Sequence, residues 1–215
     1  ILRMRSKGKL VICDTVKMKR GKFVFEGETP CVGFALVTVV PEGKESVQMR
    51  LALENSKIEM KGDWKNVGMD EEGELVVKGM TVTGSKNNDV NEEIGKQWKV
   101  VETLPGFTKY AELAKKVQDN PEILEDTTFY WVYRKEFDAY MARVKEEQLK
   151  IIVANPSVET AAYQLYFMMN EMPLEQLEQI FGLFDEKVGE SELASEVRAC
   201  IELRQRIEPG RPAPE

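Results

Sequence analysis

The spacing of apolar residues changes once along the chain, near Gly84. Before that point, apolar and polar residues alternate in short runs, which is the period of β-strands. Turn residues separate these runs, and their close spacing predicts an antiparallel β-sandwich or a barrel-like sheet. The predicted strands cover residues 9–18, 23–27, 31–40, 47–53, 58–61, 75–78 and 80–82.

The first two predicted strands are separated only by the short turn at residues 19–22. We therefore predict that residues 9–18 and 23–27 pair with each other as a hairpin. The next run, residues 31–40, is almost continuously apolar, which is typical of a strand buried on both faces.

From Ser85 onward, apolar residues recur every three or four positions, which is the period of an amphipathic helix. The side-chain oxygen of Ser85 can cap the first of these helices. Because the connections between helical stretches are short, neighbouring helices are expected to run antiparallel and to pack as a bundle. The sequence therefore predicts an α+β fold, with an antiparallel β domain at residues 1–84 and a helical domain at residues 85–208.

Composition narrows the class of function. The chain has 215 residues, 42% hydrophobic and 31% charged, which is typical of a soluble globular protein. The net charge of −7 argues against nucleic-acid binding, which requires a clustered basic face. The sequence contains no apolar run of the ~20 residues that a membrane span needs.

The residues that most often carry out catalysis are scarce. Histidine, the commonest general base and metal ligand, is absent. The cysteines, Cys13, Cys31 and Cys200, include no Cys-x-x-Cys pair. We interpret them as buried thiols, with a Cys13–Cys31 disulfide as the alternative. We predict no catalytic residue, cofactor site or metal site in this chain.

Three other clusters are interpreted as structural. Acidic residues at 63 and 70–72 surround Gly73, but their spacing fits no calcium loop, so we predict a solvated turn. The paired carboxylates at 146–147 and at 175 and 178 lie beside Lys and Gln, which indicates solvated helix faces. The methionines at 168, 169 and 172 are predicted to lie in the bundle core, with an adaptable partner groove as the alternative.

The aromatic residues supply the candidate interface. Residues 128–133 contain more aromatic surface than one helix face buries, so we predict that Tyr130 and Trp131 pack at the junction between the sheet and the helices. Tyr133 and Trp98 complete the possible interface. Trp64 is interpreted with Trp98 and Trp131 as a core or domain-interface anchor, with a ligand platform as the alternative. As the alternative, residues 128–133 form a docking surface for another domain or for a second copy of the chain.

The last seven residues, 209–215, are rich in proline and glycine and predict an extended linker rather than more helix. The stretch Gly-Arg-Pro-Ala-Pro-Glu within it resembles the opening segment of thioredoxin-like and peroxiredoxin-like domains. We expect such a domain to follow this linker, with an ordinary frayed tail as the alternative.

The order of β domain, helices and linker resembles the N-terminal region of TlpA-like thiol-disulfide oxidoreductases, in which a domain of unknown function precedes a thioredoxin-like (AhpC/TSA) domain. The matching segments are residues 11–15, 21–27, 54–62, 82–89, 155–157 and 161–165. The resemblance implies a periplasmic or lipid-anchored (lipoprotein) parent in the cell envelope, with its redox Cys-x-x-Cys beyond Glu215. No catalytic residue is carried onto this chain.

Two functions follow as expectations. In the first, the chain is a non-catalytic interaction module that positions the attached thioredoxin-like domain or binds its partners, and it is not itself an enzyme. In the second, it is a stand-alone ligand-binding or protein-interaction domain of the envelope. A homo-oligomer is compatible with either function.

Overall fold

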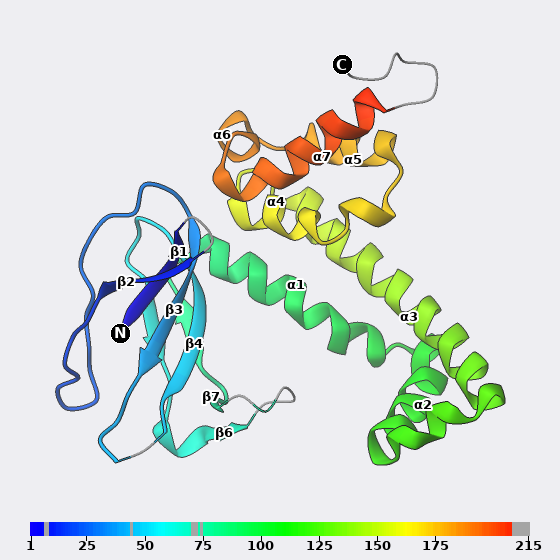
Figure 1. Cartoon of the computed structure of the whole chain (residues 1–215), viewed down its shortest axis with the longest axis horizontal. Helices are drawn as coiled ribbons and strands as arrows, with labels where there is room; N and C mark the ends of the chain where they lie inside the picture. Colours follow the sequence, from blue (N-terminus) through cyan, green and yellow to red (C-terminus); the bar gives the residue numbers. More distant parts are fainter. Residues whose placement is uncertain (7–8, 44, 70–72, 74, 208–215) are drawn as a thin grey trace.

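The structure is a computed structural model that describes residues 1–6, 9–43, 45–69, 73 and 75–207. Every strand in this part of the chain precedes Gly84, and every α-helix follows it. The predicted α+β class, with an N-terminal antiparallel sheet followed by helices, is confirmed (Figure 1). The predicted linker at 209–215 lies outside the described residues.

The main sheet has four antiparallel strands in the order β2-β1-β3-β4. The strands are β1 (Leu2–Ser6), β2 (Lys9–Asp14), β3 (Gly33–Val39) and β4 (Val47–Leu53). Alternate residues of β1, β3 and β4 share one face, because Ala35 lies opposite both Met4 and Leu51 in the register. That face forms the core of the sheet domain around Leu2, Ala35, Val37 and Leu51.

Two smaller antiparallel pairs complete the β region. Strand β5 (Glu59–Lys61) pairs with β8 (Thr81–Thr83), and β6 (Val67–Met69) pairs with β7 (Leu75–Val77). Gly84 then turns the chain into the first helix with φ +85°. A Cβ at this position would lie 2.1 Å from the backbone oxygen of Lys57, so only glycine fits the turn.

The predicted pairing of residues 9–18 with residues 23–27 in a hairpin is wrong. The turn at 19–22 is present, since Lys19 and Lys22 exchange backbone hydrogen bonds of 2.8 and 3.0 Å, but residues 23–27 belong to no strand. Strand β2 pairs instead with β1, a strand the alternating pattern did not predict. Phe23 and Phe25 pack against the core face of the sheet, so burial of their rings takes the place of backbone pairing.

Two long helices form an arm that projects from the sheet (Figure 1). Helix α1 (Lys86–Glu102) leads away from the sheet, and Ser85 caps it as predicted by accepting a hydrogen bond from the Asn88 N–H. Helix α2 (Thr108–Asp119) forms the far end, and α3 (Thr127–Ala154) returns along α1. The remaining helices pack beside the return end: α4 (Glu159–Tyr166), α5 (Leu174–Phe181), α6 (Glu186–Gly189) and α7 (Ser195–Arg206).

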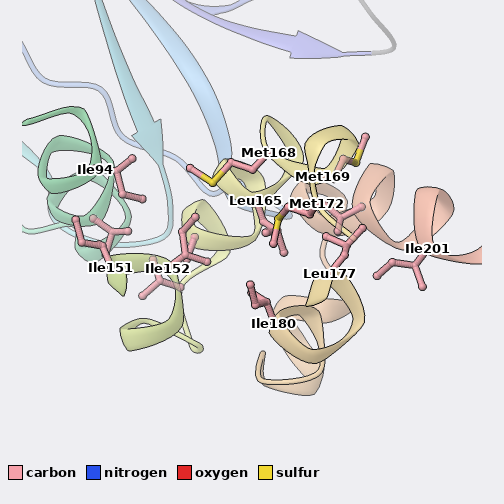
Figure 2. Packing of buried hydrophobic residues seen from close by; sticks show 14 residues of the cluster. Ile94, Ile151, Ile152, Leu165, Met168, Met169, Met172, Leu177, Ile180 and Ile201 are labelled. Atoms are coloured by element: carbon pink, nitrogen blue, oxygen red, sulfur yellow. The ribbon is translucent and has the colours of Figure 1, made fainter. Parts of the chain in front are cut away.

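The helical core lies where α1 and α3 meet α4, α5 and α7, and Figure 2 shows it at close range. Leu165, Leu177 and Ile152 are fully buried at its centre. Met168, Met169 and Met172 are buried in the same cluster, so the prediction that they belong to the bundle core is confirmed. Flexible methionine side chains fill the irregular space left where short helices cross at different angles.

Candidate functional site

The sheet domain carries a groove with a volume of about 860 Å³. It lies between the segment after β2, the end of β3 and the 3-10 helix η1 (Trp64–Asn66). This volume falls within the range typical of small-molecule sites. Its apolar lining comes from Met18, Phe23, Phe25, Val37, Val40 and Trp64.

The turn at 19–22 explains how the aromatic side of the groove forms. Arg20 and Gly21 adopt left-handed backbone conformations with φ +50° and +74°, which reverse the chain sharply. The reversal brings Phe23 and Phe25 back over the sheet. Their rings meet edge to face with centroids 5.6 Å apart, a favourable arrangement for aromatic pairs.

The same turn joins two lining residues, Met18 and Phe23, and carries positive charge at the edge of the groove, although Lys17 is the cation of the lining itself. Lys17, Lys19, Arg20 and Lys22 are all exposed, and no acidic residue lies between Thr15 and Phe25. None of the four cations makes an ion pair with a described residue. Glu42 supplies a negative charge elsewhere in the lining.

A second feature, the polar junction between sheet and helices, centres on Asn88 of α1. Its amide nitrogen donates to the Ala52 carbonyl at 2.7 Å, and its amide oxygen accepts from the Ala52 N–H at 2.8 Å. Both residues are buried. The side chain of Asn88 therefore bonds the edge strand β4 much as a neighbouring strand would.

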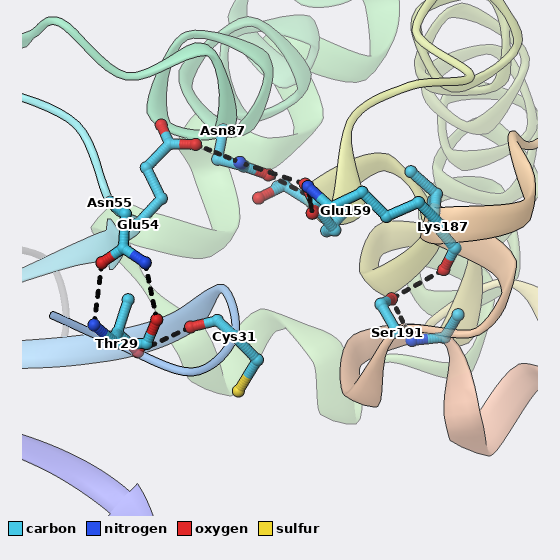
Figure 3. A network of polar contacts seen from close by, with 11 residues as sticks. Thr29, Cys31, Glu54, Asn55, Asn87, Glu159, Lys187 and Ser191 are labelled. Atoms are coloured by element: carbon cyan, nitrogen blue, oxygen red, sulfur yellow. Dashed lines mark hydrogen bonds and ion pairs between the residues drawn. The ribbon is translucent and has the colours of Figure 1, made fainter.

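Asn87 extends this junction to α4 (Figure 3). Its amide nitrogen donates to Glu54 at 2.9 Å and to Glu159 at 3.4 Å, and its amide oxygen accepts from the Thr160 N–H at 2.9 Å. Glu159 is 6% exposed and also pairs with Lys187 of α6 at 3.2 Å. The Asn87 amide therefore joins Glu54, which follows β4, to Glu159 and Thr160 in the first turn of α4.

The loop ahead of β3 contacts both sides of the junction, and Figure 3 shows its contact with the end of β4. Thr29 and Asn55 exchange two hydrogen bonds of 2.8 Å, which fix this loop to the end of β4. The Cys31 thiol donates to Glu192 of the 3-10 helix η5 (Glu192–Ala194) at 3.3 Å. Partial burial and the neighbouring Glu192 carboxylate raise the pKa of the Cys31 thiol, which makes it a weaker nucleophile.

The prediction of buried cysteines is wrong for Cys13, which is exposed on the edge strand β2, while Cys31 and Cys200 are half-buried. All three thiols are free, so the alternative Cys13–Cys31 disulfide is absent. An alternating pattern does not show that β2 is an edge strand, and an edge position leaves its side chains less covered.

The aromatic residues of the arm form a stack at the end that carries α2. Tyr110 stacks on Tyr140 with centroids 4.1 Å apart, and Tyr133 and Phe137 continue the stack. Burial and the neighbouring tyrosines raise the pKa of Tyr110 to about 12. Trp98 lies beside this stack, and its carbonyl accepts a 2.7 Å hydrogen bond from the Tyr140 hydroxyl.

The predicted junction position of Tyr130 and Trp131 is wrong. Both lie in the first turns of α3, next to α2 and far from the sheet (Figure 1), and Trp131 is 64% exposed. Helix packing against α2 uses the stripe of Tyr133, Phe137 and Tyr140, which leaves Trp131 on the outer side. An interface role for Tyr130, Trp131, Tyr133 and Trp98 stays a prediction.

The three tryptophans do not form one platform, because Trp64 lies at the groove whereas Trp98 and Trp131 lie on the arm. Asp63 of the predicted acidic turn caps η1, while residues 70–72 lie outside the described part. Glu146 and Glu147 pair with Arg143 and Lys150 on the outside of α3. The described residues contain no cluster of three metal-binding side chains.

Sequence reasoning missed the role of three asparagines: Asn87 and Asn88 join the sheet to the helices, and Asn55 fixes the loop ahead of β3 to the end of β4. Two adjacent asparagines, two and three residues after the capping Ser85, were a signal that could have been noticed. No described helix is long and apolar enough to cross a membrane.

Comparison with known proteins gives one match, to the first part of the chain. No curated protein and no solved structure matches. The match covers the sheets and the first turns of α1, and so includes the groove and the asparagines of the junction. Residues 1–91 are similar to a family described as Domain of unknown function (DUF4369).

Proposed function

We propose that this chain is a non-catalytic module that holds an attached domain in a fixed position. The attached domain would be the thioredoxin-like domain of an envelope thiol-disulfide oxidoreductase. The single observation that supports a positioning role is the buried polar junction around Asn87 and Asn88. This junction joins the sheet to two different helices, α1 and α4.

The junction resists opening because its polar groups are buried. Separating α1 from β4 leaves the N–H and carbonyl of Ala52 without partners unless water enters. Each buried polar group left without a partner costs about 1–3 kcal/mol. The sheet and the helices are therefore expected to move as one rigid body.

The last helix is fixed to the same body. The Arg204 guanidinium donates to the carbonyls of Met169 and Met172 at 3.1 and 2.9 Å, and Gln205 donates to Glu178 at 2.6 Å. These contacts hold the final turn of α7 against the helices before it. Because the end of α7 is fixed, a domain attached after it would begin at a defined position relative to the sheet.

The chemistry in this proposal comes from the attached domain. Thiol exchange through a Cys-x-x-Cys needs two neighbouring thiols, and Cys13, Cys31 and Cys200 lie on β2, before β3 and in α7. The purified chain should give no turnover in the reduction of insulin disulfides with dithiothreitol, whereas the parent protein with its following domain should. Turnover by this chain alone would contradict the proposal.

The positioning role has its own test in the parent protein. Arg204→Ala should slow the reduction of insulin, a protein substrate that has to be placed correctly, but not the reduction of a small disulfide. Asn170→Ala, an exposed neighbour, is the matched control and should change neither rate. Equal rates on insulin for Arg204→Ala and the unaltered parent would argue against positioning.

A further inference from the structure

The groove on the sheet domain has an apolar interior and lies beside a cationic turn that joins two of its lining residues, Met18 and Phe23, and the positioning role uses neither property. We infer that it binds one molecule of an anionic amphiphile, with a single acyl chain in the groove and a carboxylate at the turn of residues 17–22. This inference stands independently of the proposed positioning function, because the groove does not include the asparagines of the junction.

The interior suits an acyl chain. Phe23, Phe25 and Trp64 supply aromatic walls, and Val37 and Val40 supply aliphatic ones. Transfer of methylene groups from water to such a surface is favourable and scales with the area buried. The volume of about 860 Å³ fits a ligand of this size rather than a single solvent molecule.

The rim selects the charge of the ligand. Lys17 lines the groove, and Lys19, Arg20 and Lys22 follow in the turn between the lining residues Met18 and Phe23, on a protein whose net charge is −7. They have no ion-pair partner among the described residues, so a bound carboxylate would not compete with an existing contact. Glu42 is the acidic residue of the lining and would disfavour an anion placed beside it, which directs the head group towards Lys17.

The shape of the groove favours the binding of a single amphiphile over insertion of this region into a membrane surface. Phe23, Phe25 and Val37 line the hollow as buried or half-buried side chains, with Met18, Val40 and Trp64 exposed at its mouth, whereas insertion into a bilayer needs apolar side chains that project from a convex or flat face. Charge complementarity and the hollow together therefore favour a monomeric ligand.

The test uses Trp64 as the reporter. A chain carrying Trp98→Phe and Trp131→Phe keeps Trp64 as its sole tryptophan, and its fluorescence is titrated with decanoate below the micellar concentration. We expect a saturable change with decanoate, binding weaker by about tenfold with octanoate, and weaker binding of decyltrimethylammonium than of decanoate. No saturable response to decanoate, or equal affinity for the cationic amphiphile, would overturn the inference.

Two variants separate the rim from the interior. Lys17→Glu with Lys22→Glu should weaken decanoate binding about fivefold, whereas Lys115→Glu, an exposed residue of α2, should leave it unchanged. Val40→Asp places a charge on the exposed part of the lining and should abolish binding without unfolding the chain, as checked by circular dichroism. Equal effects of the rim and α2 substitutions, or binding to anionic vesicles without binding of monomeric decanoate, would contradict the assignment.

Discussion

The side chain of Asn88 substitutes for one residue of a missing strand beside β4. Its amide carries N–H donors and an acceptor oxygen on the same carbon, and it uses one of each on Ala52. A serine or an aspartate at this position has no such pair of groups. The choice of asparagine therefore follows from the geometry of the edge strand rather than from helix propensity, which is low for asparagine.

Replacing Asn88 tests this interpretation at the scale of one residue. Asn88→Ala leaves the N–H and the carbonyl of Ala52 unpaired, so we expect the free energy of unfolding to fall by about 2–4 kcal/mol. Asn170→Ala, at an exposed position, should change it by less than about 0.5 kcal/mol. Urea unfolding followed by circular dichroism measures both values, and equal stability of the two variants would show that the Ala52 contacts are dispensable.

Helix α3 packs only part of its apolar surface against neighbouring helices. One stripe, with Tyr133, Phe137 and Tyr140, packs against α2 and α1, while Trp131 faces outward from the first turns. The composition of residues 128–133 indicates that this surface exceeds one face. It does not indicate which neighbour covers the remainder, because that depends on the direction in which the helix runs.

A pair of substitutions in α3 measures the difference between its two sides. Trp131→Ala should change the free energy of unfolding by less than about 0.5 kcal/mol, because the side chain is largely exposed. Tyr140→Ala removes a ring that is 4% exposed and its hydrogen bond to Trp98, so a loss of about 3–5 kcal/mol is expected. A large loss for Trp131→Ala in thermal unfolding would mean that its ring is covered in solution, for example by a second copy.

The sequence allowed the helices to be predicted better than the sheet pairing. The cap at Ser85 and the stripe of α3 are local patterns, and the structure has both. The partner of β2 is set by contacts across the sheet, which an alternating pattern does not encode. The groove was missed for the same reason, since its walls come from several separate segments, from Ile1 to Trp64, that meet only after folding.

At the scale of the whole molecule, the sheet and the helices have separate apolar cores. Polar contacts connect them, together with the ring contact between Phe34 of β3 and Tyr163 of α4, whose centroids are 4.7 Å apart. Contacts of Asn87 with Glu54, Glu159 and Thr160 couple them. The other oxygen of Glu54 is buried without a partner among the described residues, so Glu54 depends strongly on Asn87.

Unfolding followed by two probes tests this coupling. In the chain with Trp64 as the sole tryptophan, Trp64 fluorescence reports on the sheet, and circular dichroism at a helical wavelength reports on the helices. We expect the two thermal transitions to coincide. With Asn87→Ala added they should separate, whereas with Asn170→Ala they should still coincide. Separate transitions before any junction substitution would show that the two regions are independent.

The length of the arm makes the position of its far end sensitive to the exact geometry of the junction. Helix α1 has 17 residues, so its far end lies about 25 Å from the first turn. A rotation of about 5° at Asn88 would then displace that end, and the exposed aromatic residues beside it, by about 2 Å. A small change in the angle at which α1 leaves the sheet would therefore be magnified into a clear shift at Tyr130 and Trp131, although neither residue touches the sheet.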